Sequence, residues 1–320
     1  MKKILLFVLA VFFALTPAVH AQEYGVYVKA VDKIKGTFDD AVRNTEEALK
    51  KNGWHVLASY EASVPENCGF KAYNIVIDSP EYDKQIISHG PTASFAIPLR
   101  VELYQDEKGL NAAFMNPASI NRTVLGDETE KQLSLSTMKK LSEILASAVH
   151  GDVVNRQIGE IRSEGRVGGM GGGDFAEMPE VMYKKDDAPG VFQEIAAKVK
   201  EGITSNNKGW KLVYTLEPAK DILMYGINNP ATEARAYGIA GEKRESKNYR
   251  CPGIDHAAAF PIEVVIYKER GVVKVVTLDE MYRMKLYFQD AGNWAFIKNM
   301  RMPGQIKREI VEICTSKLEK

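Results

Sequence analysis

Two loops hold the residues with the clearest chemical potential. His89 lies in the loop Ser88-His89-Gly90-Pro91, and Cys251, Asp255 and His256 lie in a second loop rich in Gly and Pro. Imidazole and thiol groups change protonation near neutral pH, which suits binding or redox chemistry. Cys251 and His256, with Asp255, could form a cysteine nucleophile with its base, or a soft-metal site. Their five-residue spacing is a signature of neither, so we predict binding residues and no catalytic ones.

Methionines give a second, weaker indication of chemistry. Met281 and Met284 are three residues apart, and Met300 and Met302 flank one arginine. Thioethers favour soft metals such as Cu(I), although methionine also fills protein cores. A redox- or soft-metal-linked accessory protein is therefore the alternative function. The sequence shows no evident cofactor motif and predicts no metal site.

The cysteines leave the disulfide pairing open. Cys68, Cys251 and Cys314 are an odd number, so at least one thiol stays unpaired or pairs between chains. Cys314 continues the helical stripe of Ile306, Ile310 and Ile313. This spacing predicts a buried thiol in a helix.

The first residues predict an export signal. Lys2 and Lys3 precede an uncharged apolar run, Ile4 to Leu15, and Ala21 follows a break at Pro17. This order is typical of a secretory signal peptide, so we expect residues 1–21 to be removed and the protein to be periplasmic or secreted. No later segment approaches the length of a membrane span, so we expect no membrane insertion after cleavage.

The composition argues against a disordered, a collagen-like or a multi-span membrane protein. The chain has 320 residues, is 45% hydrophobic, and balances 42 Lys+Arg against 42 Asp+Glu. These values are typical of a globular protein of about two domains. The balance of charge gives no support for a nucleic-acid partner.

The same order of features occurs twice. Gly53-Trp54-His55-Val56 corresponds to Gly209-Trp210-Lys211-Leu212, and the strand led by Pro98 corresponds to the strand led by Pro261. We also align Tyr73-Asn74-Ile75 with Tyr237-Gly238-Ile239, which makes Tyr73 and Tyr237 recurring candidates for binding. The interpretation is a duplication, with a first domain over 22–152, a Gly-rich linker over 153–177 and a second, divergent domain over 178–320.

Each copy is predicted to be a β-α-β-β-β-β-α unit. Residues 37–51 predict a helix with Thr37 as its N-cap, and 54–61, 72–78, 98–104 and 110–115 predict strands. Helices and antiparallel strands are segregated, so the fold class is α+β, with helices on one face of each sheet.

The first copy resembles the DUF302 family. The resemblance lies in the helix ending Ala48-Leu49-Lys50-Lys51-Asn52-Gly53-Trp54 and in the strand Ile97-Pro98-Leu99-Arg100-Val101-Glu102-Leu103-Tyr104. It covers most of 24–150 and returns more weakly over 180–318, where Ile262-Glu263 replaces Leu-Arg. The resemblance implies a compact α+β domain of unknown biochemical role and brings no catalytic residues.

We therefore expect an exported, non-catalytic module that binds a small molecule or a protein. Two copies facing each other would create a cleft, with His89, Cys251 and His256 at its rims. A small hydrolase is a third possibility, since Glu61 and Glu217 end equivalent strands.

Overall fold

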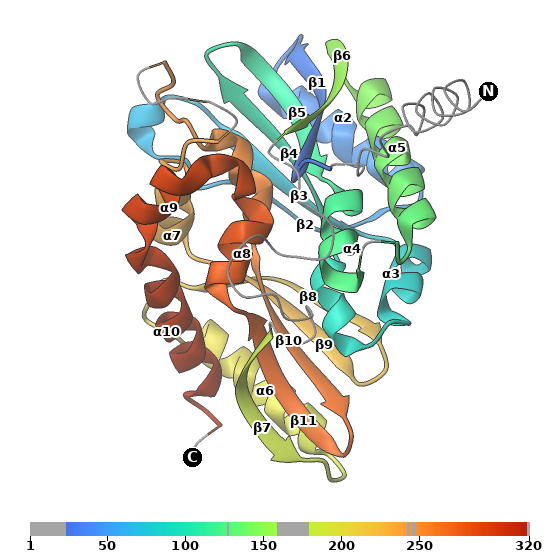
Figure 1. Cartoon of the computed structure of the whole chain (residues 1–320), viewed down its shortest axis with the longest axis vertical. Helices are drawn as coiled ribbons and strands as arrows, with labels where there is room; N and C mark the ends of the chain where they lie inside the picture. The colour runs from blue at the N-terminus through green and yellow to red at the C-terminus, as the bar shows by residue number, and fades with distance from the viewer. Residues whose placement is uncertain (1–23, 127, 159–178, 242–243, 245–247, 319–320) are drawn as a thin grey trace, which may run out of the picture.

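A computed structural model describes residues 24–126, 128–158, 179–241, 244 and 248–318 (Figure 1). The predicted signal peptide over 1–21 and residues 159–177 of the predicted linker lie outside this part of the chain. Residues 153–158, which we predicted as the start of the linker, belong to a strand instead. The first unit therefore extends to residue 158.

The first unit contains six strands, four α-helices and two short 3₁₀ segments among its described residues. In chain order they are β1 (Tyr27–Ile34), α2 (Phe38–Lys51), β2 (His55–Glu61), η1 (Glu66–Cys68), β3 (Ala72–Asp78), α3 (Pro80–Ile87), η2 (Pro91–Ala96), β4 (Leu99–Asp106), β5 (Gly109–Met115), α4 (Pro117–Leu125), α5 (Lys131–Ala148) and β6 (Asp152–Ile158).

Among its described residues, the second unit repeats the order from β1 to β5 without a counterpart of η1, and it then ends in three α-helices and a 3₁₀ segment in place of α4, α5 and β6. Its elements are β7 (Pro179–Asp186), α6 (Val191–Thr204), β8 (Lys211–Ala219), β9 (Ile222–Asn228), α7 (Pro230–Ala236), η4 (Ile254–Ala259), β10 (Ile262–Glu269), β11 (Val272–Leu278), α8 (Glu280–Tyr287), η5 (Gln289–Ala291), α9 (Gly292–Asn299) and α10 (Arg301–Thr315).

The two antiparallel sheets have the same topology. Their strand orders are β2-β3-β4-β5-β1-β6 and β8-β9-β10-β11-β7, so β6 is the single addition. Both first hairpins also carry an irregularity at the same place, after Val56 in β2 and after Leu212 in β8. The prediction of an α+β protein built from two tandem units is confirmed.

Local signals explain the first helix. Thr37 accepts a hydrogen bond from the backbone N–H of Asp40 at 3.1 Å, which is the N-cap that we predicted. Val42, Thr45 and Leu49 are buried on one face of α2. Gly53 follows the helix with φ of +84°, a conformation that glycine adopts without a Cβ clash.

One predicted correspondence between the units is wrong. Tyr73 pairs with Leu103 in the first sheet, and the residue that pairs with the equivalent Ile266 is Leu223. Tyr237 instead lies directly after α7. The sequence prediction omitted α3 and α7, and so moved the second-unit strand from 222–228 to Tyr237.

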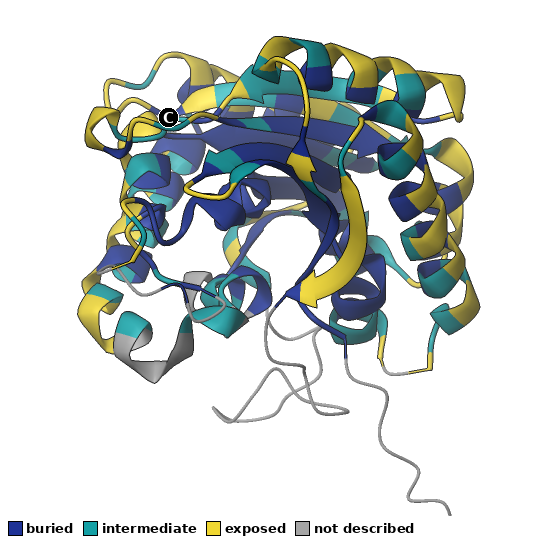
Figure 2. Cartoon of the chain, turned by 90° about the horizontal axis from the view of Figure 1, so that it is seen from above, coloured by how far each residue is buried: buried dark blue, intermediate teal, exposed yellow. Residues whose placement is uncertain are grey.

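Each sheet has one face toward its own helices and one toward the other unit. In the first unit, α2 and α5 pack on each other and on strands β2 and β1. Segment η4 of the second unit packs on β3, β4 and β5, while η2 of the first unit packs on β10. Because these contacts are reciprocal, equivalent faces of the two units meet in the centre of the molecule. In Figure 2 the strands in the middle of the molecule are buried, and the outer sides of the helices are exposed.

Candidate functional site

Strand β4 carries a row of polar side chains into the contact between the units. Arg100, Glu102, Tyr104 and Asp106 lie at alternate positions of the strand and are all buried. Alternate residues of a strand point to the same face, so these four face the second unit. The polar face of β4 is therefore buried inside the molecule, because the second unit covers it.

Arg100 forms an ion pair with Glu263, and both side chains are buried. The two residues occupy equivalent positions, two residues after Pro98 and Pro261. Arg100 also donates hydrogen bonds to the carbonyl oxygens of Ala258 at 3.4 Å and Pro261 at 3.2 Å. A charge of each sign at equivalent positions therefore joins the two units.

Glu102 lies beside η4. One of its carboxylate oxygens accepts a hydrogen bond from the backbone N–H of Ala258 at 2.6 Å, and the other has no hydrogen-bond partner among the described residues. Burial raises the pKa of Glu102 to about 8, and the nearby charge of Asp255 acts in the same direction. Burial therefore favours the neutral, protonated form of the Glu102 carboxyl.

His256 is completely buried and pairs with Asp290. Its Nε2 lies 2.9 Å from each carboxylate oxygen of Asp290, and its ring packs edge-on against Phe288 with 4.8 Å between ring centroids. Burial by itself lowers the pKa of His256, but the charge of Asp290 and its hydrogen bond outweigh burial and raise that pKa to about 9. His256 is consequently a buried cation at neutral pH.

A second ion pair and a disulfide lie nearby and also connect the units. Arg244 donates from Nη1 to Asp106 at 2.8 Å and lies 3.6 Å from Asp255. Cys68 of the first unit is disulfide-bonded to Cys251 of the second, with 5.5 Å between their Cα atoms. The disulfide thus fixes the loop before η4 to the first unit.

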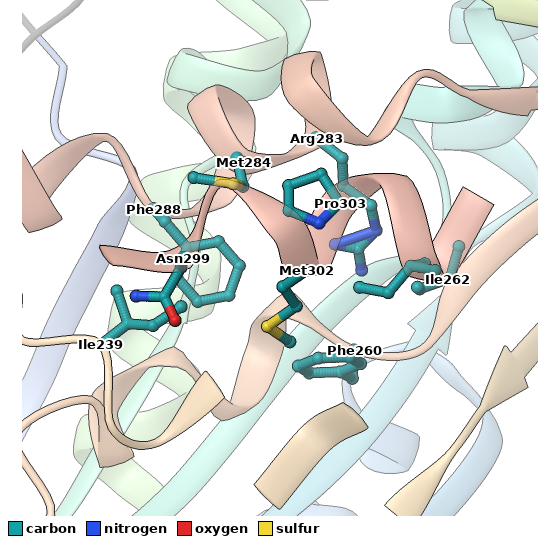
Figure 3. A pocket seen from close by; sticks show the side chains of 10 residues that line it. Ile239, Phe260, Ile262, Arg283, Met284, Phe288, Asn299, Met302 and Pro303 are labelled. Carbon is teal, nitrogen blue, oxygen red and sulfur yellow. The ribbon is translucent and has the colours of Figure 1, made fainter. Parts of the chain in front are cut away.

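The described pocket belongs to the second unit alone. It encloses ≈ 430 Å³, part of it open to solvent, between the start of β10 and the last three helices (Figure 3). Its lining is almost entirely apolar and consists of Ile239, Phe260, Ile262, Arg283, Met284, Phe288, Asn299, Met302, Pro303 and Ile306.

The polar groups of the pocket are already engaged or lie at its edge. Arg283 donates from Nη2 to the carbonyl oxygens of Ala259 and Pro261, and its guanidinium packs on the ring of Tyr287 at 4.6 Å. In Figure 3, Met302 lies in the middle of the lining, with Phe260 on one side and Phe288 and Asn299 on the other. Phe288 separates this space from His256.

The structure does not bring the predicted histidines together. The side chain of His89 is 35% exposed and its Nε2 lies 2.9 Å from Glu130 of its own unit, whereas His256 is buried. Cys251 is disulfide-bonded, so the free thiol on which our nucleophile and metal hypotheses depended is absent. Of the three, His256 is the one that adjoins the pocket, through Phe288.

The two predicted tyrosines also lie apart. Tyr73 is half-buried on β3 and contacts Phe38 of α2, so it faces the helices of the first unit. Tyr237 is buried, and its hydroxyl donates to Glu233 at 3.3 Å. Neither residue lines the pocket.

Sequence reasoning missed the residues that do form the pocket. Phe260 follows η4 directly, Arg283 lies on α8 and Met302 lies on α10. A usable signal was present for Met284 and Met302, in the methionine pairs 281/284 and 300/302. Within the described part of the chain, no group of three or more His, Cys, Asp or Glu side chains could hold a metal ion.

Fold and site together define a two-unit α+β protein with a charged contact between its units and an apolar pocket in the second. Residues 29–148, which lie within the first unit, match the family model "Domain of unknown function DUF302". A solved structure, "uncharacterized conserved protein DUF302 from Bacillus stearothermophilus", is similar at 16% identity and a TM-score of 0.33, covering 39% of this chain and 98% of that one. The comparison with curated proteins found no match. Among the residues that the structure describes, no helix is long and apolar enough to cross a membrane.

Proposed function

We propose that this protein is an exported, non-catalytic binding protein whose second unit takes up a small apolar molecule. The observation that carries the proposal is the almost entirely apolar lining of the pocket. Small-molecule sites are typically concave and mostly apolar, with a few polar groups. Since Arg283 already binds two backbone carbonyls, the part of the ligand that enters is uncharged.

The disulfide supports the export part of the proposal. Disulfides persist in oxidising compartments outside the cytoplasm, and Cys68 and Cys251 are bonded across the two units. The basic start and apolar run of residues 1–21 agree with this location. We expect the mature protein to begin at Gln22, and N-terminal sequencing of protein from the periplasm or medium tests this. An intact Met1 on membrane-bound protein would contradict it.

The pocket can be tested with an apolar fluorescent probe, N-phenyl-1-naphthylamine. We expect saturable binding by the wild type and binding at least about tenfold weaker for Met302→Trp, a loss equivalent to roughly 1.4 kcal/mol, because the larger indole fills the space. The matched control is Met300→Trp, since Met300 is 56% exposed and does not line the pocket. Urea unfolding of both variants verifies that they are folded. No saturable binding, or equal binding by all three proteins, would overturn the proposal.

A soft-metal role is the second candidate function. Met284 and Met302 both line the pocket, and thioethers are ligands for Cu(I). Elemental analysis of protein purified in its exported form separates the two functions. Stoichiometric copper that Met302→Leu removes would favour the metal role over the apolar ligand.

A further inference from the structure

The segment around the pocket is locally basic in a chain without net charge. Residues 291–308 include Lys298, Arg301, Lys307 and Arg308 and no Asp or Glu, whereas the whole chain balances 42 basic against 42 acidic residues. Lys307 lies against Glu180 at 2.5 Å, but Lys298, Arg301 and Arg308 are exposed. The end of α9 and the start of α10 therefore present positive charge to solvent.

Exposed apolar side chains lie next to two of these basic residues. Ile297 is 54% exposed and Met300 is 56% exposed, so two large apolar side chains reach the surface directly beside Lys298 and Arg301 in the sequence. We call Ile297, Lys298, Met300 and Arg301 the basic corner. Asn299 and Met302 lie between and next to these residues in the sequence and line the pocket. One short segment therefore forms both an exposed surface and a wall of the pocket.

We propose that the basic corner docks on an anionic phospholipid surface, and that the pocket behind it receives an acyl chain from that surface. The proposal rests on the proposed function for its second half and names the ligand class of the same pocket. Segments with basic residues among large apolar ones bind at the surface of anionic membranes, where cations meet lipid headgroups and apolar side chains reach the acyl boundary.

The geometry favours a lipid over an acidic protein. An acidic partner would account for Lys298 and Arg301, but not for exposed Ile297 and Met300 beside an apolar pocket lining. A lipid surface satisfies both, because it offers anionic headgroups and hydrocarbon at adjacent depths. Docking of this kind lies on the membrane and needs no spanning helix.

The first test measures binding of the mature full-length protein to vesicles of phosphatidylcholine, with and without phosphatidylglycerol. We expect binding to need the anionic lipid and to weaken with added salt. Lys298→Gln/Arg301→Gln should bind about 30-fold more weakly, since each cation near an anionic surface contributes about a factor of five. The control is Lys51→Gln/Lys139→Gln, which removes two exposed cations from the first unit.

The second test separates docking from the pocket. Lys298→Gln/Arg301→Gln should bind soluble N-phenyl-1-naphthylamine as the wild type does. Met302→Trp should still bind anionic vesicles but fail to extract a fluorescent acyl chain from them. If Met302→Trp keeps the soluble probe, the proposed function fails, whatever the vesicles show.

Three results would overturn the docking proposal. They are equal binding to both kinds of vesicle, an equal loss in the control variant, and unchanged vesicle binding by Lys298→Gln/Arg301→Gln. If Met302→Trp still extracts the fluorescent acyl chain, the claim that the pocket receives an acyl chain is wrong.

Discussion

The ion pair between Arg100 and Glu263 should carry much of the coupling between the two units. Replacing Arg100 with Met leaves the Glu263 carboxylate buried without its cation, and Glu263→Met leaves the guanidinium without its anion. Breaking a buried pair in this way costs about 3–5 kcal/mol of the free energy of unfolding. Both side chains are at most 3% exposed, so solvent does little to reduce this cost.

The double variant Arg100→Met/Glu263→Met should be far less destabilised than the sum of the two. It removes both charges, and methionine fills similar volume. Pro261 keeps a donor, because Arg283 also binds its carbonyl oxygen at 3.2 Å. The carbonyl of Ala258 loses its donor, which costs on the order of 1 kcal/mol. With about 3–5 kcal/mol lost in each single variant and about 1 kcal/mol in the double variant, the coupling free energy from the double-mutant cycle should be at least about 5 kcal/mol.

Urea unfolding of the disulfide-bonded protein gives the free energy of unfolding of the wild type, the two single variants and the double variant. Circular dichroism and tryptophan fluorescence should give the same midpoints if unfolding is two-state. The charge exchange Arg100→Glu/Glu263→Arg is a further check, since the two positions are equivalent and the pair would be restored in reverse. A coupling below about 0.5 kcal/mol would refute the argument, because distant and independent residues give values of that size.

Two further predictions concern the buried groups near η4. His256 has its folded-state pKa raised to about 9, so its pairing with Asp290 stabilises the protein fully below about pH 6.5, the value for the unfolded chain, and is lost as the pH rises through 9. The free energy of unfolding should fall by roughly 3 kcal/mol over that range, and a His256→Gln variant with an unaltered slope would contradict this assignment. Titration of the denatured, unreduced protein should find one reactive thiol, and three after reduction, because Cys68 and Cys251 are bonded; reduction should lower the free energy of unfolding by about 2–4 kcal/mol. Three thiols before reduction would disprove the bond.

Much of the fold could be predicted because its signals are local. The N-cap at Thr37, the apolar face of α2 and the alternation after Pro98 all depend on residues close together in the sequence. Helices α3 and α7 were missed since 8 and 7 residues are too few to show a helical period. Their prolines at the first helical position were the signal available.

The charged contact between the units could not be predicted from one strand. Alternating polar residues in β4 indicate a strand with one wet face, and the sequence alone does not say what covers that face. The pocket has the same origin, since Phe260, Arg283 and Met302 meet only when η4, α8 and α10 pack together. Our candidates came from side-chain chemistry in loops, whereas burial and pairing decide which of those side chains face a ligand.

Arg100 and Glu263 occupy equivalent positions in the two units but carry opposite charges. Such a difference is possible because the two units lie in tandem on one chain. Two identical units meeting through this face would bring an arginine against its own copy, and two buried like charges repel strongly. Tandem units on one chain can differ, so one position keeps the cation and the other supplies the anion. The same freedom applies away from the contact. The second unit has diverged around α8 to α10, and that divergence is where the pocket and the basic corner lie, while the first unit retains the match to DUF302. The division predicts that the first unit stabilises the contact and that ligand binding resides in the second.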